Sequence, residues 1–159
     1  MAPHPPSSPT HFPGFYRFVF LWLEPVSILA GAVLAFFMQA TYLHWTHAAS
    51  APGAPVPIST SIVLDQLANL YLGLAALEAS LLRASSDTLV WKVVIIILLC
   101  ADVGHLYSVR ALGTTIYWQY WRWNPIDWGN VPFVYFLAAT RISMLLGVGI
   151  KGKREKLKY

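Results

Sequence analysis

The sequence predicts an all-α integral membrane protein, a four-helix bundle with both termini in the cytoplasm. Composition is the first support: 57% of the 159 residues are hydrophobic and only 11% are charged, whereas a soluble domain has about 25% charged residues. The second is the presence of four long apolar segments, since a helix needs about 20 mainly apolar residues to cross the hydrocarbon layer. These predicted spans are residues 15–40, 61–82, 89–112 and 128–150.

The first span contains Glu24 followed by Pro25. Because proline removes a backbone donor and crowds the preceding turn, we expect a kink at this point. The preceding residues 1–14 hold five prolines and neither lysine nor arginine. They are therefore expected to form a disordered or extended arm rather than a secretory signal.

Residues 41–59, between the first two spans, contain three prolines and are predicted to form a loop. Ser59 or Thr60 stands just before the second span and is a candidate N-cap. A short polar link, residues 83–88, joins the second span to the third.

The distribution of basic residues predicts the orientation. The link between spans two and three is flanked by Arg83 and Lys92, and the tail at residues 151–159 is strongly basic. Positive charge marks the cytoplasmic side, so both termini and this link are expected there. Arg110 and Arg122 on the other side oppose this assignment without reversing it. An aromatic cluster suits the luminal interface: Tyr117, Trp118, Tyr120, Trp121 and Trp123.

Asp102 and His105 lie inside the third span and are three residues apart, so they share one helix face. An Asp at the lipid-facing centre of a helix costs roughly 2.5–3.5 kcal/mol, and the pair is therefore expected to face the protein interior or a wet cavity. One interpretation is a proton donor–acceptor pair at a functional site. The other is a structural hydrogen bond that ties the third span to Asn69 or Gln66 of the second.

Glu24 and Arg141 fall at similar depth, about 14 Å from the cytoplasmic ends of their spans at a rise of 1.5 Å per residue. Opposite charges at one level favour a structural ion pair, although Glu24 is also a candidate acid for catalysis. Glu78 is shallower, and a local pair with Arg83 or Lys92 is expected.

Other polar and aromatic residues complete a candidate pocket near the luminal side, and they are expected to contact a ligand. The predicted catalytic residues are Asp102, His105 and Glu24. The predicted ligand-binding residues are Gln66, Asn69, Tyr107, Asp127, Trp128 and Asn130.

Metal and cofactor chemistry is not predicted. His44 and His47 are three residues apart, but no acidic residue stands near them, and no zinc-site spacing is present. There is no phosphate loop, nucleophile elbow or dinucleotide fingerprint. The basic tail suits anionic lipid rather than nucleic acid, so no nucleic-acid partner is expected.

Three segments carry a resemblance to an uncharacterised family of small four-span membrane proteins common in filamentous fungi: residues 20–25, 102–108 and 124–131. This resemblance covers about residues 15–149 and implies the topology without an activity. A weaker likeness, in architecture and residue type, is to the emopamil-binding-protein class, which includes sterol isomerases. It implies that Glu24, Asp102, His105, Trp128 and Asn130 surround a sterol-sized pocket.

Two function classes remain. The first is an acid–base isomerase or cyclase acting on a sterol- or terpenoid-like lipid; the second is a non-catalytic protein that binds such a lipid or scaffolds other enzymes. A transporter or channel is less favoured, because no inverted repeat is visible. The expected partners are the bilayer, a hydrophobic small molecule, and a membrane protein or a second copy of the chain. The expected location is the endoplasmic reticulum.

Overall fold

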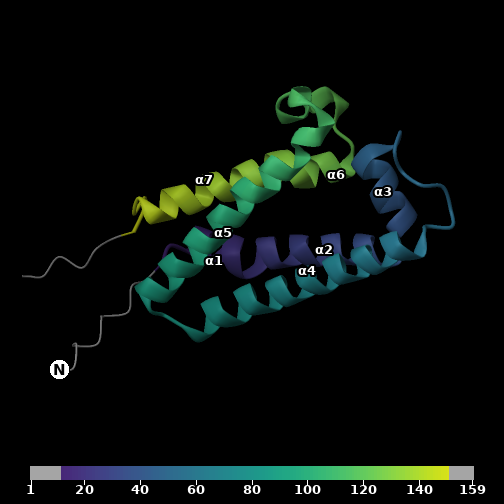
Figure 1. The fold of residues 1–159 in the computed structure, drawn as a ribbon. Coiled ribbons are helices and arrows are strands. Elements are labelled where there is room, and N and C mark those ends of the chain that lie inside the picture. Colours follow the sequence, from purple (N-terminus) through teal and green to yellow (C-terminus); the bar gives the residue numbers. More distant parts are fainter. Residues whose placement is uncertain (1–11, 151–159) are drawn as a thin grey trace, which may run out of the picture.

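The computed structural model describes residues 12–150, and every regular element in that range is a helix (Figure 1). The predicted all-α class is therefore confirmed. Most of the proline-rich arm and the whole basic tail lie outside the described residues. Three helices are long and apolar enough to cross a membrane, and they correspond to the first three predicted spans: Gly14–Phe37, Ile58–Ala84 and Thr88–Leu112.

The first of these helices is interrupted by a π-helical turn just before Pro25. Its pieces are α1 (Gly14–Phe18), the π-helical turn Val19–Leu23 and α2 (Glu24–Phe37). Pro25 has no N–H to donate to the carbonyl of Leu21, four residues earlier. That carbonyl instead accepts a hydrogen bond from the Arg83 side chain. At the site of the predicted kink, the helix thus widens into a π-helical turn, and the free Leu21 carbonyl is hydrogen-bonded by a side chain of a neighbouring helix.

The segment predicted as a loop after the first span contains a short helix, α3 (Gln39–His47). Met38, with φ −128° and ψ 43°, breaks the helix between α2 and α3. Helix α3 is held at its far end by Asn124, whose side-chain amide donates to the Trp45 carbonyl at 2.7 Å. The loop prediction was wrong here because this contact, which comes from a distant part of the chain, is invisible in local sequence.

The second long helix, α4 (Ile58–Ala84), begins earlier than predicted, with Pro57 at the N-cap position and no side-chain cap. Neither Ser59 nor Thr60 is the N-cap, because both already lie inside the first turn. Helix α5 (Thr88–Ser108) follows a link of three residues and is capped by Asp87, which accepts from the Leu89 N–H at 2.8 Å.

Short 3₁₀ turns follow α5 between Val109 and Arg122. The last helical segment then begins at Pro125 and ends at Leu145. Its pieces are α6 (Pro125–Trp128), the π-helical turn Gly129–Phe133 and α7 (Val134–Leu145). It starts three residues before the predicted fourth span, because Asn124 and Asp127 form a capping box.

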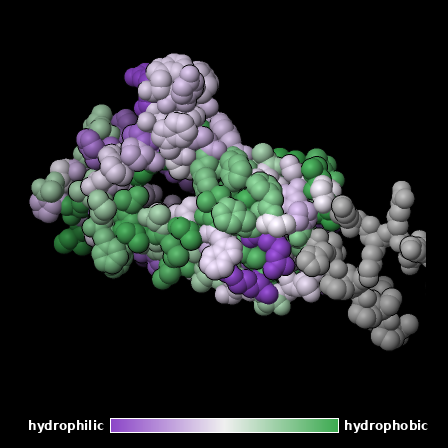
Figure 2. Space-filling model, turned by 180° about the vertical axis from the view of Figure 1, so that it is seen from behind, coloured by the Kyte–Doolittle hydropathy of each residue, from purple (hydrophilic) through white to green (hydrophobic). Residues whose placement is uncertain are grey.

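The long helices form two pairs, α2 with α4 and α5 with α7, which converge at one end and diverge toward α3 and α6 (Figure 1). A hydrophobic cluster fills the converging end: Phe12, Tyr16, Val19, Phe20, Leu21, Leu82, Trp91, Ile95, Leu137 and Met144. Large apolar side chains also cover much of the outside, with Leu70 68% exposed and Phe37 74% exposed. Figure 2 shows a hollow between the two halves of the molecule.

Candidate functional site

A cavity of about 530 Å³ lies between the diverging helix pairs. All of the long helices contribute to its wall, together with α3 and α6. Most of the wall is apolar, with Leu34, Leu74 and Phe133 among its residues. The polar side chains in the wall are Glu24, Ser27, Tyr42, Tyr71, Asp102, His105, Asn130 and Arg141. The cavity therefore combines a large apolar surface with a few grouped polar side chains.

Arg141 of α7 is the centre of the polar group. Its side chain is 1% exposed and makes ion pairs with Glu24 of α2 and Asp102 of α5. The guanidinium carbon lies over the Phe20 ring, 5.8 Å from the ring centroid. Depth along the spans had suggested the Glu24 pair, but the second carboxylate was not foreseen. One guanidinium thus links three helices. Without it, the two buried carboxylates would have no counter-charge.

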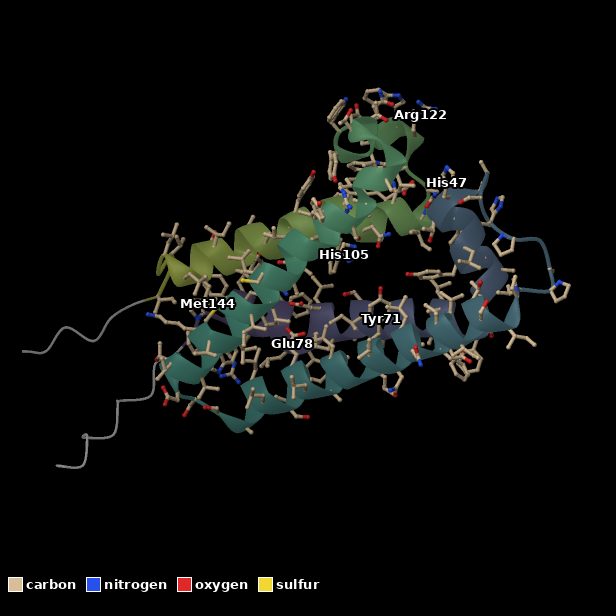
Figure 3. The ribbon with its side chains drawn as sticks, in the orientation of Figure 1. His47, Tyr71, Glu78, His105, Arg122 and Met144 are labelled. Atoms are coloured by element: carbon tan, nitrogen blue, oxygen red, sulfur yellow. The ribbon has the colours of Figure 1, made fainter. Side chains whose placement is uncertain are left out.

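Asp102 and His105 share a face of α5 but have different partners. The Asp102 carboxylate accepts from Arg141, whereas the His105 ring lies beside the Asn130 side chain. His105 Nε2 is buried and has no hydrogen-bond partner among the described residues. Figure 3 shows His105 and Tyr71 directed toward the space between the helix pairs. The imidazole is therefore available to a molecule in the cavity.

Glu78 does not make the local pair that was expected with Arg83 or Lys92. It is 1% exposed and lies against the Glu24 carboxyl in the interior. Arg83 instead donates to the carbonyls of Ala79 and Leu21. The spacing of the buried residues of α4 explains this outcome, because Glu78 belongs to the stripe that packs against α2. That stripe is Leu64, Ala68, Ala75, Glu78 and Leu82.

Gln66 and Asn69 were expected near Asp102 and His105, and this prediction was wrong. Both side chains are exposed and neither lines the cavity. Successive residues turn by about 100° around a helix, so these two positions face away from the buried stripe of α4. Tyr71 and Leu74, which follow that stripe, line the cavity in their place.

Tyr107 was also wrongly expected in the pocket. It is 63% exposed and lies under the Arg110 guanidinium, 3.8 Å from the ring centroid. It comes two residues after His105 and so faces another side of α5. Asp127 is buried, but its carboxylate accepts from the Asn124 N–H at 3.0 Å and does not line the cavity.

Trp128 and Asn130, by contrast, do line the cavity. They come from α6 and the π-helical turn that follows it. The indole of Trp128 is half-exposed and packs edge-on against Trp123, with 5.2 Å between the ring centroids. The wide end of the cavity therefore has an aromatic rim next to an amide.

Gly31, Tyr42 and Tyr71 are among the cavity residues that were not predicted from the sequence. A Cβ placed on Gly31 would lie 3.4 Å from the Tyr71 ring, so glycine lets the aromatic side chain lie close to α2. Tyr42 comes from α3, and burial, with a further contribution from Tyr71, raises the pKa of its phenol above the usual value. The stripe of α4 could have indicated Tyr71, whereas Tyr42 lies in the segment predicted as a loop.

Comparison with known proteins places the chain in a family without a described activity. Residues 9–151 match the family described as "Domain of unknown function (DUF7704)". No curated protein matches the chain, and no solved structure does. The likeness to sterol isomerases therefore stays a prediction, while membership of an uncharacterised family is confirmed. The chain belongs to the DUF7704 family.

Proposed function

We propose that this chain is a multi-pass membrane protein whose intramembrane cavity binds a lipid of sterol or terpenoid size. The observation that carries the proposal is the cavity of about 530 Å³ inside the bundle. Binding sites for small molecules are typically about 300–1,000 Å³, mainly apolar, with a few well-placed polar groups. The cavity has this size and this character.

The exterior supports placement in a bilayer. Three helices have the required length and apolar character, and large hydrophobic side chains on them face outward. We propose that the segment from Pro125 to Leu145 is the fourth span and that both termini are cytoplasmic. Residence in the endoplasmic reticulum belongs to the same proposal. The bilayer would then supply the ligand directly to the bundle.

The arrangement of the wall favours an amphipathic ligand. An apolar body would contact leucine and phenylalanine side chains, and a hydroxyl or similar group would meet His105 Nε2 or Glu24 Oε2. Both of these atoms are buried and lack a hydrogen-bond partner within the described range. Buried polar atoms of this kind are normally satisfied, and a bound ligand would satisfy them.

Lipid extraction and mass spectrometry on the protein purified in mild detergent test this proposal. We expect one lipid class to be enriched over the surrounding lipid, and to be lost in Gly31→Leu, because the new side chain and the displaced Tyr71 ring enter the cavity. Gly73→Leu is the matched control, since a Cβ at Gly73 meets nothing within 4 Å. Equal lipid profiles for the protein and Gly31→Leu would contradict the proposal.

A second candidate function, acid–base isomerisation of the bound lipid, is favoured by the free His105 nitrogen beside the cavity. In this mechanism the Glu24 carboxylic acid adds a proton to one carbon of a double bond. His105 then removes a proton from a neighbouring carbon, and the double bond re-forms in its new position. Proton exchange between the two side chains restores the starting state. Asp102, held by Arg141, would stabilise the intermediate cation.

Incubation of the purified protein with its co-purifying lipid separates the two functions. Binding alone leaves the lipid unchanged, whereas catalysis converts it to an isomer of the same mass and different retention time. His105→Gln should retain the lipid and lose conversion. Conversion at the original rate in His105→Gln would contradict the role given to the imidazole.

A further inference from the structure

Glu78 is an acid that the proposed lipid site does not use. Its side chain is buried at 1% exposure, and both carboxyl oxygens lack a hydrogen-bond donor among the described residues. The neighbouring Glu24 Oε2 also lacks a donor. The Glu78 carboxyl lies against Glu24, and Figure 3 shows it in the interior between the helix pairs. Two carboxyl groups therefore meet inside the protein with no donor between them.

The charges around Glu78 do not balance if every acid is ionised. Glu24 of α2, Asp102 of α5 and Arg141 of α7 are the charged groups that act on it. Arg141 already binds Glu24 and Asp102, and Arg83 is directed to backbone carbonyls. Three carboxylates and one guanidinium carry a net charge of −2, which is strongly unfavourable in a buried, apolar setting.

We propose that Glu24 and Glu78 form a proton-binding site, with one proton held between their carboxyl groups at neutral pH. Glu78 carries the proton and donates an O–H hydrogen bond to Glu24 Oε2. In this resting arrangement Glu24 is ionised toward Arg141 through Oε1, and movement of the shared proton to Oε2 gives the protonated Glu24 that the isomerisation mechanism uses. Two adjacent carboxyl groups that share one proton avoid the repulsion of two neighbouring negative charges. This inference goes beyond the proposed lipid site and does not depend on the identity of a ligand.

The shared proton gives a partner to two of the buried oxygens that lack one, Glu24 Oε2 and one oxygen of Glu78. The single proton supplies a donor for Glu24 Oε2, uses one Glu78 oxygen, and lowers the net charge of the cluster from −2 to −1. Glu24 also lines the cavity, whereas Glu78 does not. The proton is thus held one hydrogen bond behind the cavity wall.

Infrared spectroscopy of the full chain in lipid nanodiscs tests the proposal. At neutral pH the protein should show the carbonyl band of a protonated carboxylic acid, shifted in deuterated water. Glu78→Gln should lose this band and keep the thermal unfolding midpoint, because a neutral amide of equal size replaces a neutral acid and still donates to Glu24. Asp65→Asn on the same helix is the control and should retain the band, since Asp65 accepts from the Gln39 side chain.

Three results would overturn the proposal. The first is the absence of a protonated carboxyl band from the unmodified protein at neutral pH. The second is persistence of that band at full intensity in Glu78→Gln. The third is failure of Glu78→Gln to fold while Asp65→Asn folds, because that result would show that the position requires a negative charge.

Discussion

Replacing Arg141 with methionine removes the cation from the buried cluster and preserves much of the side-chain length. The guanidinium serves Glu24 and Asp102, whose side chains are 4% and 9% exposed. Water therefore cannot easily replace the lost donors. Removal of one partner from a buried ion pair costs about 3–5 kcal/mol. Because two carboxylates lose their partner together, we expect Arg141→Met to lose about 4–5 kcal/mol of unfolding free energy, the upper part of this range.

Reversible unfolding in mixed micelles, followed by far-ultraviolet circular dichroism, measures this loss. Arg122→Met is the matched control, because Arg122 is exposed and, within residues 12–150, its side chain hydrogen-bonds only the side chain of Gln119, at 3.3 Å. It should change stability by no more than about 0.5 kcal/mol. Adding Glu24→Gln and Asp102→Asn to Arg141→Met should recover at least about 2 kcal/mol, because the unpaired charges are then absent. A loss below about 1 kcal/mol in Arg141→Met would refute this account of the cluster.

The other predictions concern contacts that position the helices. Asn124→Ala should lose about 1–2 kcal/mol, because it removes both the cap of α6 and the bond to the Trp45 carbonyl; thermal unfolding measures this, and a loss no greater than that of the exposed Asn69→Ala would contradict it. Arg83→Met should cost about 1 kcal/mol by leaving the Leu21 carbonyl without its donor. Adding Pro25→Ala should recover part of that loss by supplying an N–H, and no recovery in the double variant would count against this explanation.

The helices were predictable because length and apolar composition are local properties of a sequence. Three of the predicted spans coincide with long apolar helices to within a few residues. An effect of Pro25 on the first helix was also predictable, since the missing N–H is a property of one residue, although the structure shows a π-helical turn at Val19–Leu23. The position of Arg83 against Leu21 was not, because it depends on how α4 packs along α2.

The position of the site residues along the helix axes was predictable, but the direction in which each side chain points around its helix was not. A rise of 1.5 Å per residue predicts similar depths for Glu24 and Arg141 along their helices, and the structure shows the two side chains in contact. The same estimate placed Asn69 beside Asp102, although its side chain faces away. Depth says nothing about rotation around the helix axis. The stripe of small and apolar residues that contains Glu78 indicates, in the sequence itself, which side of α4 faces inward.

The central claim is that the cavity between the helix pairs holds a lipid. Native mass spectrometry of the protein released from mild detergent tests it directly, because bound molecules appear as discrete mass additions to each chain. We predict one lipid per chain for the unmodified protein and for Gly73→Leu, and none for Gly31→Leu, whose side chain enters the cavity beside Tyr71. Absence of a lipid adduct from the unmodified protein, or equal occupancy in Gly31→Leu, would contradict the claim.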